Sequence, residues 1–248
     1  MNPSLLITGG SRGIGAATAV LAAQRGWDVA INYTRDAAAA ERVAAEVRAT
    51  GRRALVVQAD VSDEAQVLAM FVAVDQQFGA LGGLVNNAGV VDVPARVDEM
   101  SLQRLMRMFA INLSGSFLCA REAVKRMSTR HGGAGGVIVN LSSAAARLGS
   151  PGQYVDYAAA KAGIDTFTLG LAREVASEGI RVNAVRPGII DTDIHASGGL
   201  PERARQVAPM VPMQRAGSAG EVAQAIVWLL SEAASYTTGA VLDVSGGR

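Results

Sequence analysis

Residues 8–15 read Thr8-Gly9-Gly10-Ser11-Arg12-Gly13-Ile14-Gly15, directly after an apolar strand expected over Leu5–Thr8 and at the start of a helix. Glycines at such a junction permit a tight turn and let the backbone approach a pyrophosphate, whose charge the helix N-terminus stabilises. Glycines also serve plain turns, but the strand before this loop and the helix after it favour phosphate binding. The residues expected to bind the phosphates are Gly9, Ser11, Arg12, Gly13, Ile14 and Gly15.

The alternation of short apolar segments with longer amphipathic ones continues along the whole chain. Strands are expected over Leu5–Thr8, Asp28–Tyr33, Ala54–Gln58, Gly83–Asn86, Val137–Leu141, Arg181–Val185 and Val241–Val244. Their Val, Ile and Leu residues do not alternate strictly with polar ones, which is typical of strands buried on both faces. The sequence therefore predicts an α/β fold in which helices cover both faces of a parallel sheet.

Helices are expected between these strands. The clearest are Ala37–Thr50, Ser62–Phe78 with Ser62 as its N-terminal cap, Ser101 to about Arg130, and Tyr154–Ser177. Residues 190–219 differ, because prolines and glycines interrupt any regular period there. A long irregular segment of this kind predicts a lid over a site. No repeat or linker is visible, so we expect one domain over residues 1–248.

The composition excludes several classes of function. Half of the 248 residues are hydrophobic, 18% are charged, and the net charge is +1, which argues against a nucleic-acid surface or a polybasic membrane patch. Cys119 is the only cysteine, so no internal disulfide and no cysteine-based metal site is expected. No apolar run is long enough to span a membrane, and a cytoplasmic protein without a bound metal is the expectation.

Tyr157 and Lys161 form the most informative pair in the sequence. Residues four apart share one face of a helix, and an ammonium beside a phenol favours the phenolate and lowers its pKa. A tyrosine placed in this way can exchange a proton with an alcohol or a ketone. Lys occurs only at Lys125 and Lys161 among 23 Lys and Arg residues, which suggests that a compact charge is needed here. A solvated surface pair is the alternative interpretation.

The end of the second strand bears on which nucleotide is bound. A site for NAD places a carboxylate about 20 residues beyond the glycine loop, where it binds the adenosine ribose. Here Tyr33, Thr34 and Arg35 occupy that region, and Arg12 lies in the loop itself. Two guanidinium groups without a carboxylate favour a 2′-phosphate, and hence NADP(H) over NAD(H). The alternative is that Asp36 binds the ribose and both arginines are ordinary surface charges.

With these motifs identified, the chain resembles the short-chain dehydrogenase/reductase family over nearly its whole length. The resemblance rests on the order and separation of seven short motifs: Thr8 to Gly15, Asp60-Val61, Asn86-Asn87-Ala88-Gly89, Asn112, Ser142-Ser143, Tyr157 to Lys161 and Pro187-Gly188. It implies a three-layer αβα Rossmann-type doubly wound fold with a seven-stranded parallel sheet. It also implies hydride transfer between a nicotinamide and a carbonyl compound or its secondary alcohol.

The resemblance also implies a role for individual residues. Tyr157 would be the general acid/base, Lys161 would lower its pKa and hold the nicotinamide ribose, Ser143 would bind the substrate oxygen, and Asn112 would hold a water in a proton relay. The expected cofactor contacts are Asp60 and Val61 at the adenine, Asn86, Ala88 and Gly89 along the adenosine side, and Pro187, Gly188, Ile189 and Thr192 at the carboxamide. Ser143 precedes Tyr157 by 14 positions, one more than in many relatives.

The substrate remains open at this level. Within the family the chain looks closest to glucose dehydrogenase-like oxidoreductases, and reductases of 3-oxoacyl chains on acyl carrier protein are an alternative. Arg130 and Arg173 fall near positions where those reductases carry docking arginines. An alternative from another class is a non-catalytic NADPH-binding sensor. The resemblance, together with the apolar stripe on the helix Ser101–Arg130, implies a homotetramer.

Overall fold

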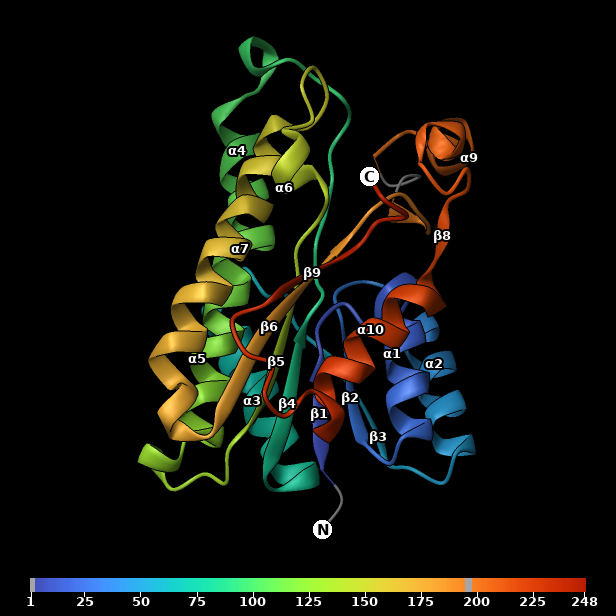
Figure 1. Ribbon diagram of the computed structural model, residues 1–248. Helices are drawn as coiled ribbons and strands as arrows, with labels where there is room; N and C mark the ends of the chain where they lie inside the picture. The colour runs from blue at the N-terminus through green and yellow to red at the C-terminus, as the bar shows by residue number, and fades with distance from the viewer. Residues whose placement is uncertain (1–2, 195–197) are drawn as a thin grey trace.

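A computed structural model describes residues 3–194 and 198–248. Seven parallel strands form one sheet in the order β3-β2-β1-β4-β5-β6-β9 (Figure 1). The strands are β1 (Ser4–Ile7), β2 (Asp28–Tyr33), β3 (Ala54–Gln58), β4 (Leu81–Asn86), β5 (Gly136–Leu141), β6 (Ile180–Pro187) and β9 (Val241–Val244). The chain starts in the middle, runs outward to β3 and returns to β4, so the fold is the doubly wound Rossmann type that the sequence predicted.

Helices cover both faces of the sheet. One face packs against α1 (Gly13–Gln24), α2 (Ala37–Ala49) and α10 (Ala219–Leu230), and the other against α3 (Glu64–Phe78), α5 (Gly115–Met127) and α7 (Val155–Val175). Successive residues of a strand point to opposite faces, so Leu5 and Ile7 belong to one core and Leu6 to the other. Burial on both faces explains why these strands read as continuous apolar runs.

The strand predictions are confirmed. Asp28–Tyr33, Ala54–Gln58 and Val241–Val244 have the expected bounds, and the other four strands differ only at their ends. One helix cap was wrong. The side chain of Asp63, and not of Ser62, accepts the hydrogen bond from the Gln66 amide at the start of α3. Ser62 instead donates its hydroxyl to Asp60 at 2.6 Å, so it is no longer available as a cap.

The long helix expected from Ser101 to about Arg130 is interrupted. It consists of α4 (Leu102–Phe109), a π-helical turn (Ala110–Ser114) and α5, followed by a 3-10 turn (Thr129–His131). Asn112 lies in the π turn, where its side-chain amide donates to the Met108 carbonyl at 3.1 Å. That carbonyl is the acceptor that a regular α-helix would give to the Asn112 backbone, so the side chain competes with the helical ladder.

Residues 190–219 contain short elements in place of a long helix or strand. They include β7 (Ile190–Asp191), α9 (Arg203–Val207), a 3-10 turn (Ala208–Met210) and β8 (Gly217–Ser218), which pairs with β7. Residues 195–197 of the expected lid lie outside the described residues. The α9 segment stands across from α4 and α6 (Ala145–Leu148), at the end of the molecule opposite the N-terminus (Figure 1). No helix in the described part of the chain is long and apolar enough to cross a membrane.

Candidate active site

A pocket of about 170 Å³ lies at the carboxyl ends of the central strands. Its walls come from the start of α1, the loops after β4 and β5, the first turns of α7, the segment after β6, and α9. Both Tyr157 and Lys161 line it, together with Ser143 and Ile14. A crevice outside the carboxyl ends of the strands, where the strand order reverses, is the usual ligand position in doubly wound folds.

The glycine loop has the geometry of a phosphate cradle. Gly9 and Gly13 have φ values of 62° and 54°, which L residues with side chains rarely adopt. A Cβ on Gly15 would lie 2.5 Å from the Gly9 carbonyl oxygen, so that position requires glycine. No side chain caps the first turn of α1, and that turn holds no acidic residue. Its amides are therefore available to an anion, as the sequence predicted.

Hydrogen bonds tie the loop after β4 to the glycine loop. The Asn87 side chain donates to the carbonyls of Thr8 and Gly9, each at 2.9 Å, and the Thr8 hydroxyl accepts from the amides of Asn87 and Ala88. Sequence reasoning left Asn87 out of the site, although it stands in the quoted motif. Asn87 lines the pocket. The side chain of Asn86 is 3% exposed and donates to Asn140 and to the Ser116 carbonyl in the core, and the predicted contact of Asn86 with the adenosine stays a prediction.

The side chain of Asn112 faces the same loop. Its oxygen accepts from the Val90 amide and its nitrogen donates to the Val90 carbonyl, both at 3.0 Å. A Cβ on Gly89 would lie 2.9 Å from the Asn112 side-chain oxygen and 3.6 Å from the Lys161 nitrogen. Asn112 and Lys161 therefore approach the same stretch of backbone. The fixed position of Asn112 follows from these bonds, and its predicted role in a water relay stays a prediction.

The sequence pair Tyr157 and Lys161 stands on the wall of the pocket with Ser143. Lys161 is 4% exposed and donates to the Leu141 carbonyl at the end of β5, at 2.6 Å. Its nitrogen lies 5.7 Å from the centroid of the Tyr157 ring. Ser143 lines the same wall and lies close enough to Tyr157 to act on the pKa of its phenol. The structure therefore brings Ser143, Tyr157 and Lys161, three of the four expected catalytic residues, together on one wall of the pocket.

Burial controls the protonation of this group. It raises the pKa of Tyr157 above its ordinary value, and Ser143 offsets this only in part. Lys161 is not among the causes of this shift, since it donates to the Leu141 carbonyl and its nitrogen lies 5.7 Å from the centroid of the ring. The expected lowering of the Tyr157 pKa by Lys161 is therefore not seen in this arrangement and stays a prediction. Burial also lowers the pKa of Lys161 to about 8, while Asp165 acts in the opposite direction.

Comparisons with known proteins agree with this geometry. The family model described as enoyl-(acyl carrier protein) reductase matches residues 9–248. An uncharacterized oxidoreductase, YgfF, of Escherichia coli K12 is 57% identical over 98% of both chains. The 3-oxoacyl-[acyl-carrier-protein] reductase FabG of Staphylococcus aureus is 39% identical over 100% of this chain and 98% of that one.

The chain belongs to the short-chain dehydrogenase/reductase family.

Solved structures of this family superpose on nearly the whole chain. A mutant of a Serratia marcescens short-chain dehydrogenase/reductase has a TM-score of 0.91 and 34% identity, covering 99% of this chain and 97% of that one. Levodione reductase has a TM-score of 0.91 and 35% identity, with 99% and 96% covered. Short-chain dehydrogenases/reductases use nicotinamide cofactors, and this chain is therefore an oxidoreductase of that class.

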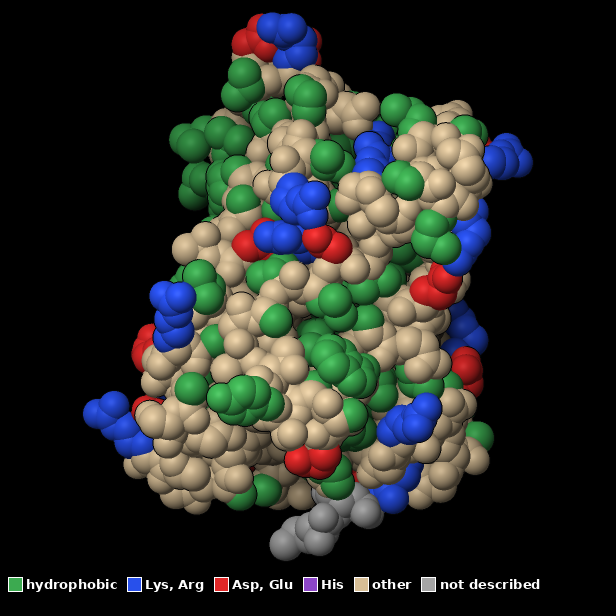
Figure 2. Space-filling view, in the orientation of Figure 1, with side chains coloured by type: hydrophobic (Ala, Val, Ile, Leu, Met, Phe, Trp, Pro, Cys, Tyr) green, Lys and Arg blue, Asp and Glu red, His purple; other side chains and the backbone are tan. Residues whose placement is uncertain are grey.

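In this short-chain dehydrogenase/reductase one exposed arginine lies in the glycine loop and another follows β2. They are Arg12 and Arg35, and neither side chain forms a hydrogen bond or an ion pair with any described residue. Most of the other described arginines form ion pairs, for example Arg147 and Arg186 with Asp243. Figure 2 shows basic and acidic side chains side by side at the centre of one face of the molecule. The side chain of Asp36 caps α2 by accepting from the Ala39 amide at 2.8 Å.

The other residues expected to contact the cofactor lie in two places, the loop after β3 and the segment at and after the end of β6. Asp60 accepts from the amide and the hydroxyl of Ser62, and the buried Val61 packs against Gly115. Thr192 lines the pocket and approaches the glycine loop, since a Cβ on Gly13 would lie 3.4 Å from its methyl carbon. Pro187, Gly188 and Ile189 also line the pocket. Among the described residues, no cluster of His, Cys, Asp and Glu side chains is suited to a metal ion.

Proposed function

We propose that the protein is an NADP(H)-dependent oxidoreductase that interconverts a carbonyl compound and its secondary alcohol. One observation carries the proposal. Tyr157, together with Ser143 and Lys161, lines a pocket that also contains Ile14 at the end of the glycine loop. Such a pocket can hold a nicotinamide and a small substrate against one proton donor.

Each side chain has a specific task in this proposal. When bound, the nicotinamide supplies or accepts the hydride. Tyr157 donates a proton to the substrate oxygen during reduction, and its raised pKa keeps the phenol protonated near neutral pH. Ser143 donates a hydrogen bond to the same oxygen as charge develops on it. The charged Lys161 binds ribose hydroxyls, and Asn112 holds the Val90 backbone beside it.

The preference for NADP(H) rests on charge at the end of β2. The alternative assigned the ribose to Asp36, but its carboxylate already serves the cap of α2. Arg12 and Arg35, exposed and without a described acidic partner, are suited to a 2′-phosphate. Arg12 lies in the glycine loop and Arg35 follows β2, and the adenosine half of the dinucleotide would lie between these two segments.

Reversing the charge of Arg35 tests this assignment. In Arg35→Glu, KM for NADPH should rise about 10-fold because a charge-assisted hydrogen bond is replaced by repulsion, whereas KM for NADH should change little. Steady-state kinetics with both cofactors measures the difference. Arg25→Glu is the control, since Arg25 is exposed at the far end of α1. Equal changes for NADPH and NADH in Arg35→Glu would refute the assignment.

The alkaline limb of the pH profile should report Lys161. Its pKa is about 8, below the raised pKa of Tyr157, so it loses its charge first as pH rises. Asp165→Asn removes the charge that favours protonated Lys161, so the fall in kcat/KM should move to lower pH by about half a unit. The exposed Glu174→Gln on the same helix should leave the limb in place. If the alkaline fall in kcat/KM of Asp165→Asn occurred at the wild-type pH, Lys161 would not be the group that controls it.

The reaction itself is tested by NADPH oxidation against a panel of ketones, sugars and 3-oxoacyl thioesters. The proposal expects turnover with at least one class. Tight binding of NADPH without reduction of any compound would favour the sensor instead. A sensor has no need of a proton-transfer group such as Ser143, Tyr157 and the buried Lys161 in one pocket.

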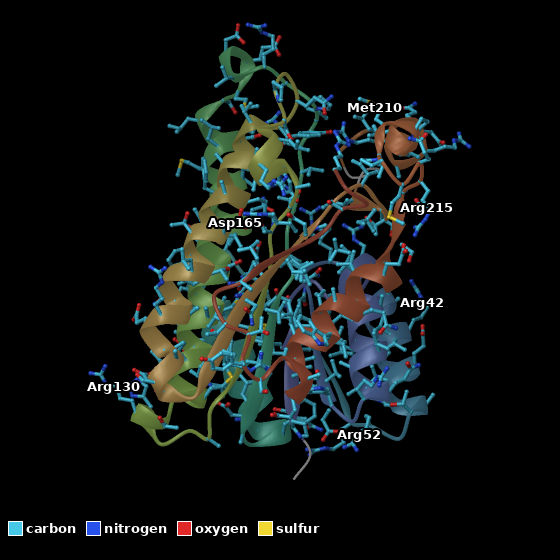
Figure 3. All side chains as sticks on the ribbon, viewed as in Figure 1. Arg42, Arg52, Arg130, Asp165, Met210 and Arg215 are labelled. Atoms are coloured by element: carbon cyan, nitrogen blue, oxygen red, sulfur yellow. The ribbon has the colours of Figure 1, made fainter. Side chains whose placement is uncertain are left out.

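A 3-oxoacyl-carrier reductase is the second candidate, because relatives at 39% identity carry that name. The arrangement of this chain does not favour a docking role for Arg130. Arg130 lies at the opposite end of the molecule from Met210 in the proposed lid (Figure 3), and it faces Glu178 at 4.0 Å. Preference for a carrier-bound thioester over its coenzyme A counterpart would support this candidate.

Assembly as a homotetramer is also a proposal. Leu102, Met106 and Phe117 on α4 and α5 are 72%, 65% and 46% exposed. Exposure of several large apolar side chains on neighbouring helices is unusual for a surface that contacts only water. Phe117 stacks on Phe167 of α7, with the ring centroids 3.7 Å apart, so the exposed face continues onto that helix. A monomer mass in light scattering at micromolar concentration would contradict this proposal.

A further inference from the structure

Cationic side chains line the pocket, and no acidic side chain of the described residues lines it with them. The cations are Lys161, Arg203 and Arg248. The proposed function accounts for Lys161. It leaves the two arginines without a task, although a guanidinium beside an otherwise apolar pocket is an expensive group to desolvate.

Arg203 is held in a fixed orientation. It belongs to α9, donates to the Gln153 side chain at 2.6 Å, and lies with its guanidinium carbon 5.2 Å from the centroid of the Tyr154 ring. Gln153 and Tyr154 immediately precede α7, so the guanidinium is anchored to the wall that carries Tyr157. It has no acidic partner among the described residues. By contrast, Arg205 on the same helix pairs with Glu202.

Arg248 supplies an independent observation. Its guanidinium nitrogen Nη1 is buried and has no hydrogen-bond partner among the described residues. A buried charged donor without an acceptor is costly, and such a group in a native structure calls for an explanation. Because Arg248 also lines the pocket, an anionic group bound there would provide the missing negative charge.

The rest of the wall limits what the anion can be attached to. Val91, Leu148, Ile189, Ile190 and Ile194 give the pocket a mainly apolar surface. A sugar, with hydroxyls on every side, would leave many of these polar groups unpaired. A compound with a short apolar body, one reducible carbonyl and one carboxylate matches the pocket, because its body contacts the apolar residues and its carboxylate can pair with the arginines.

We infer that the substrate is an oxo acid, whose carboxylate binds Arg203 and Arg248 while its carbonyl faces Tyr157. The inference rests on the proposed function. The carboxylate takes no part in the chemistry: the oxo acid, NADPH and a proton give the hydroxy acid and NADP⁺. The planar fork of a guanidinium matches a carboxylate with two hydrogen bonds, which fixes the carbonyl relative to the proton donor.

Matched pairs of substrates test the inference. The initial rate of NADPH oxidation is measured with oxo acids of increasing chain length and with the methyl ester of each. The wild-type protein should show a kcat/KM at least about 10-fold higher for the acid than for its ester, as expected for a charge-assisted pair. In Arg203→Gln, the ratio of acid to ester should fall about 10-fold.

Arg205→Gln is the control, because Arg205 is on the same short helix but exposed and paired with Glu202. It should keep the ratio within about twofold of the wild type. Arg248→Gln should change the ratio in the same direction as Arg203→Gln. Equal kcat/KM for acid and ester in the wild type, or equal ratios in Arg203→Gln and Arg205→Gln, would overturn the inference.

A binding measurement separates this inference from the proposed function. If the protein reduces neither the acids, nor the esters, nor any compound of the wider panel, the proposed function fails, and calorimetric titration of the oxo acid into the protein with NADPH bound still decides the inference. Binding of the acid that weakens in Arg203→Gln and not in Arg205→Gln would support it. No binding of the acid to the wild-type protein would refute it.

Discussion

Replacing Tyr157 by Phe should lower kcat for carbonyl reduction by about 10³-fold, with Kd for NADPH within about twofold of the wild type. The ring is retained, so its packing beside the Lys161 nitrogen is kept and only the proton donor is removed. The substrate oxygen would then have no acid in hydrogen-bonding range other than Ser143, whose hydroxyl is a far weaker acid. Stopped-flow single turnovers at saturating NADPH measure the loss, and fluorescence titration measures the binding.

The control is Tyr236→Phe, which removes a fully exposed hydroxyl. It should behave as the wild type in both measurements. If Tyr157→Phe kept more than a tenth of the wild-type kcat, another group would have to supply the proton. Loss of NADPH binding in Tyr157→Phe, with normal chemistry at saturation, would reassign the phenol to the cofactor site.

The second large effect is expected at Gly15. In Gly15→Ala the new methyl group would lie 2.5 Å from the Gly9 carbonyl oxygen, 2.6 Å from the Asn87 side-chain nitrogen and 3.0 Å from the Gly10 Cα. Two of these neighbours are backbone of the phosphate loop, which cannot move without losing its shape. Overpacking of this kind costs about 2 kcal/mol, so Kd for NADPH should rise about 30-fold.

The matched control is Gly170→Ala on α7, where an added Cβ would meet nothing within 4 Å. An exposed helical glycine replaced by alanine should leave Kd unchanged and stabilise the fold slightly. Circular dichroism and thermal unfolding of Gly15→Ala separate a damaged loop from an unfolded protein. Unchanged Kd in a folded Gly15→Ala variant would mean that the loop does not hold the phosphates.

The strands could be predicted because the residues that specify a strand are adjacent in the sequence. A strand of a parallel sheet is a short, mainly apolar run, so the buried strand Asp28–Tyr33 and the edge strand Ala54–Gln58 could both be read with their correct bounds. The glycine loop was predictable for a related reason. Gly9 and Gly15 satisfy steric demands that only glycine meets, and such positions are visible without the rest of the fold.

Other features could not be read from the pattern because distant parts of the chain compete for the same groups. Asn112 sits in a run with helical periodicity, yet its bonds to Val90 and Met108 produce a π turn. Ser62 and Asp63 were both able to cap α3, and Asp60 decided between them by binding the serine. Asn86 and Asn87 are adjacent in sequence, but one enters the core and the other reaches the glycine loop.

The sequence by itself determined the α/β fold and the position of the glycine loop, and it predicted the proton-transfer pair Tyr157 and Lys161, because each depends on residue types at short spacing. Only the tertiary structure decided the electrostatics of the site. Burial raises the pKa of Tyr157 where the pair alone suggested lowering, and folding places Arg203 and Arg248 beside it from remote segments. Desolvation and charge depend on every group within a few ångströms in space, and a linear pattern does not contain those distances.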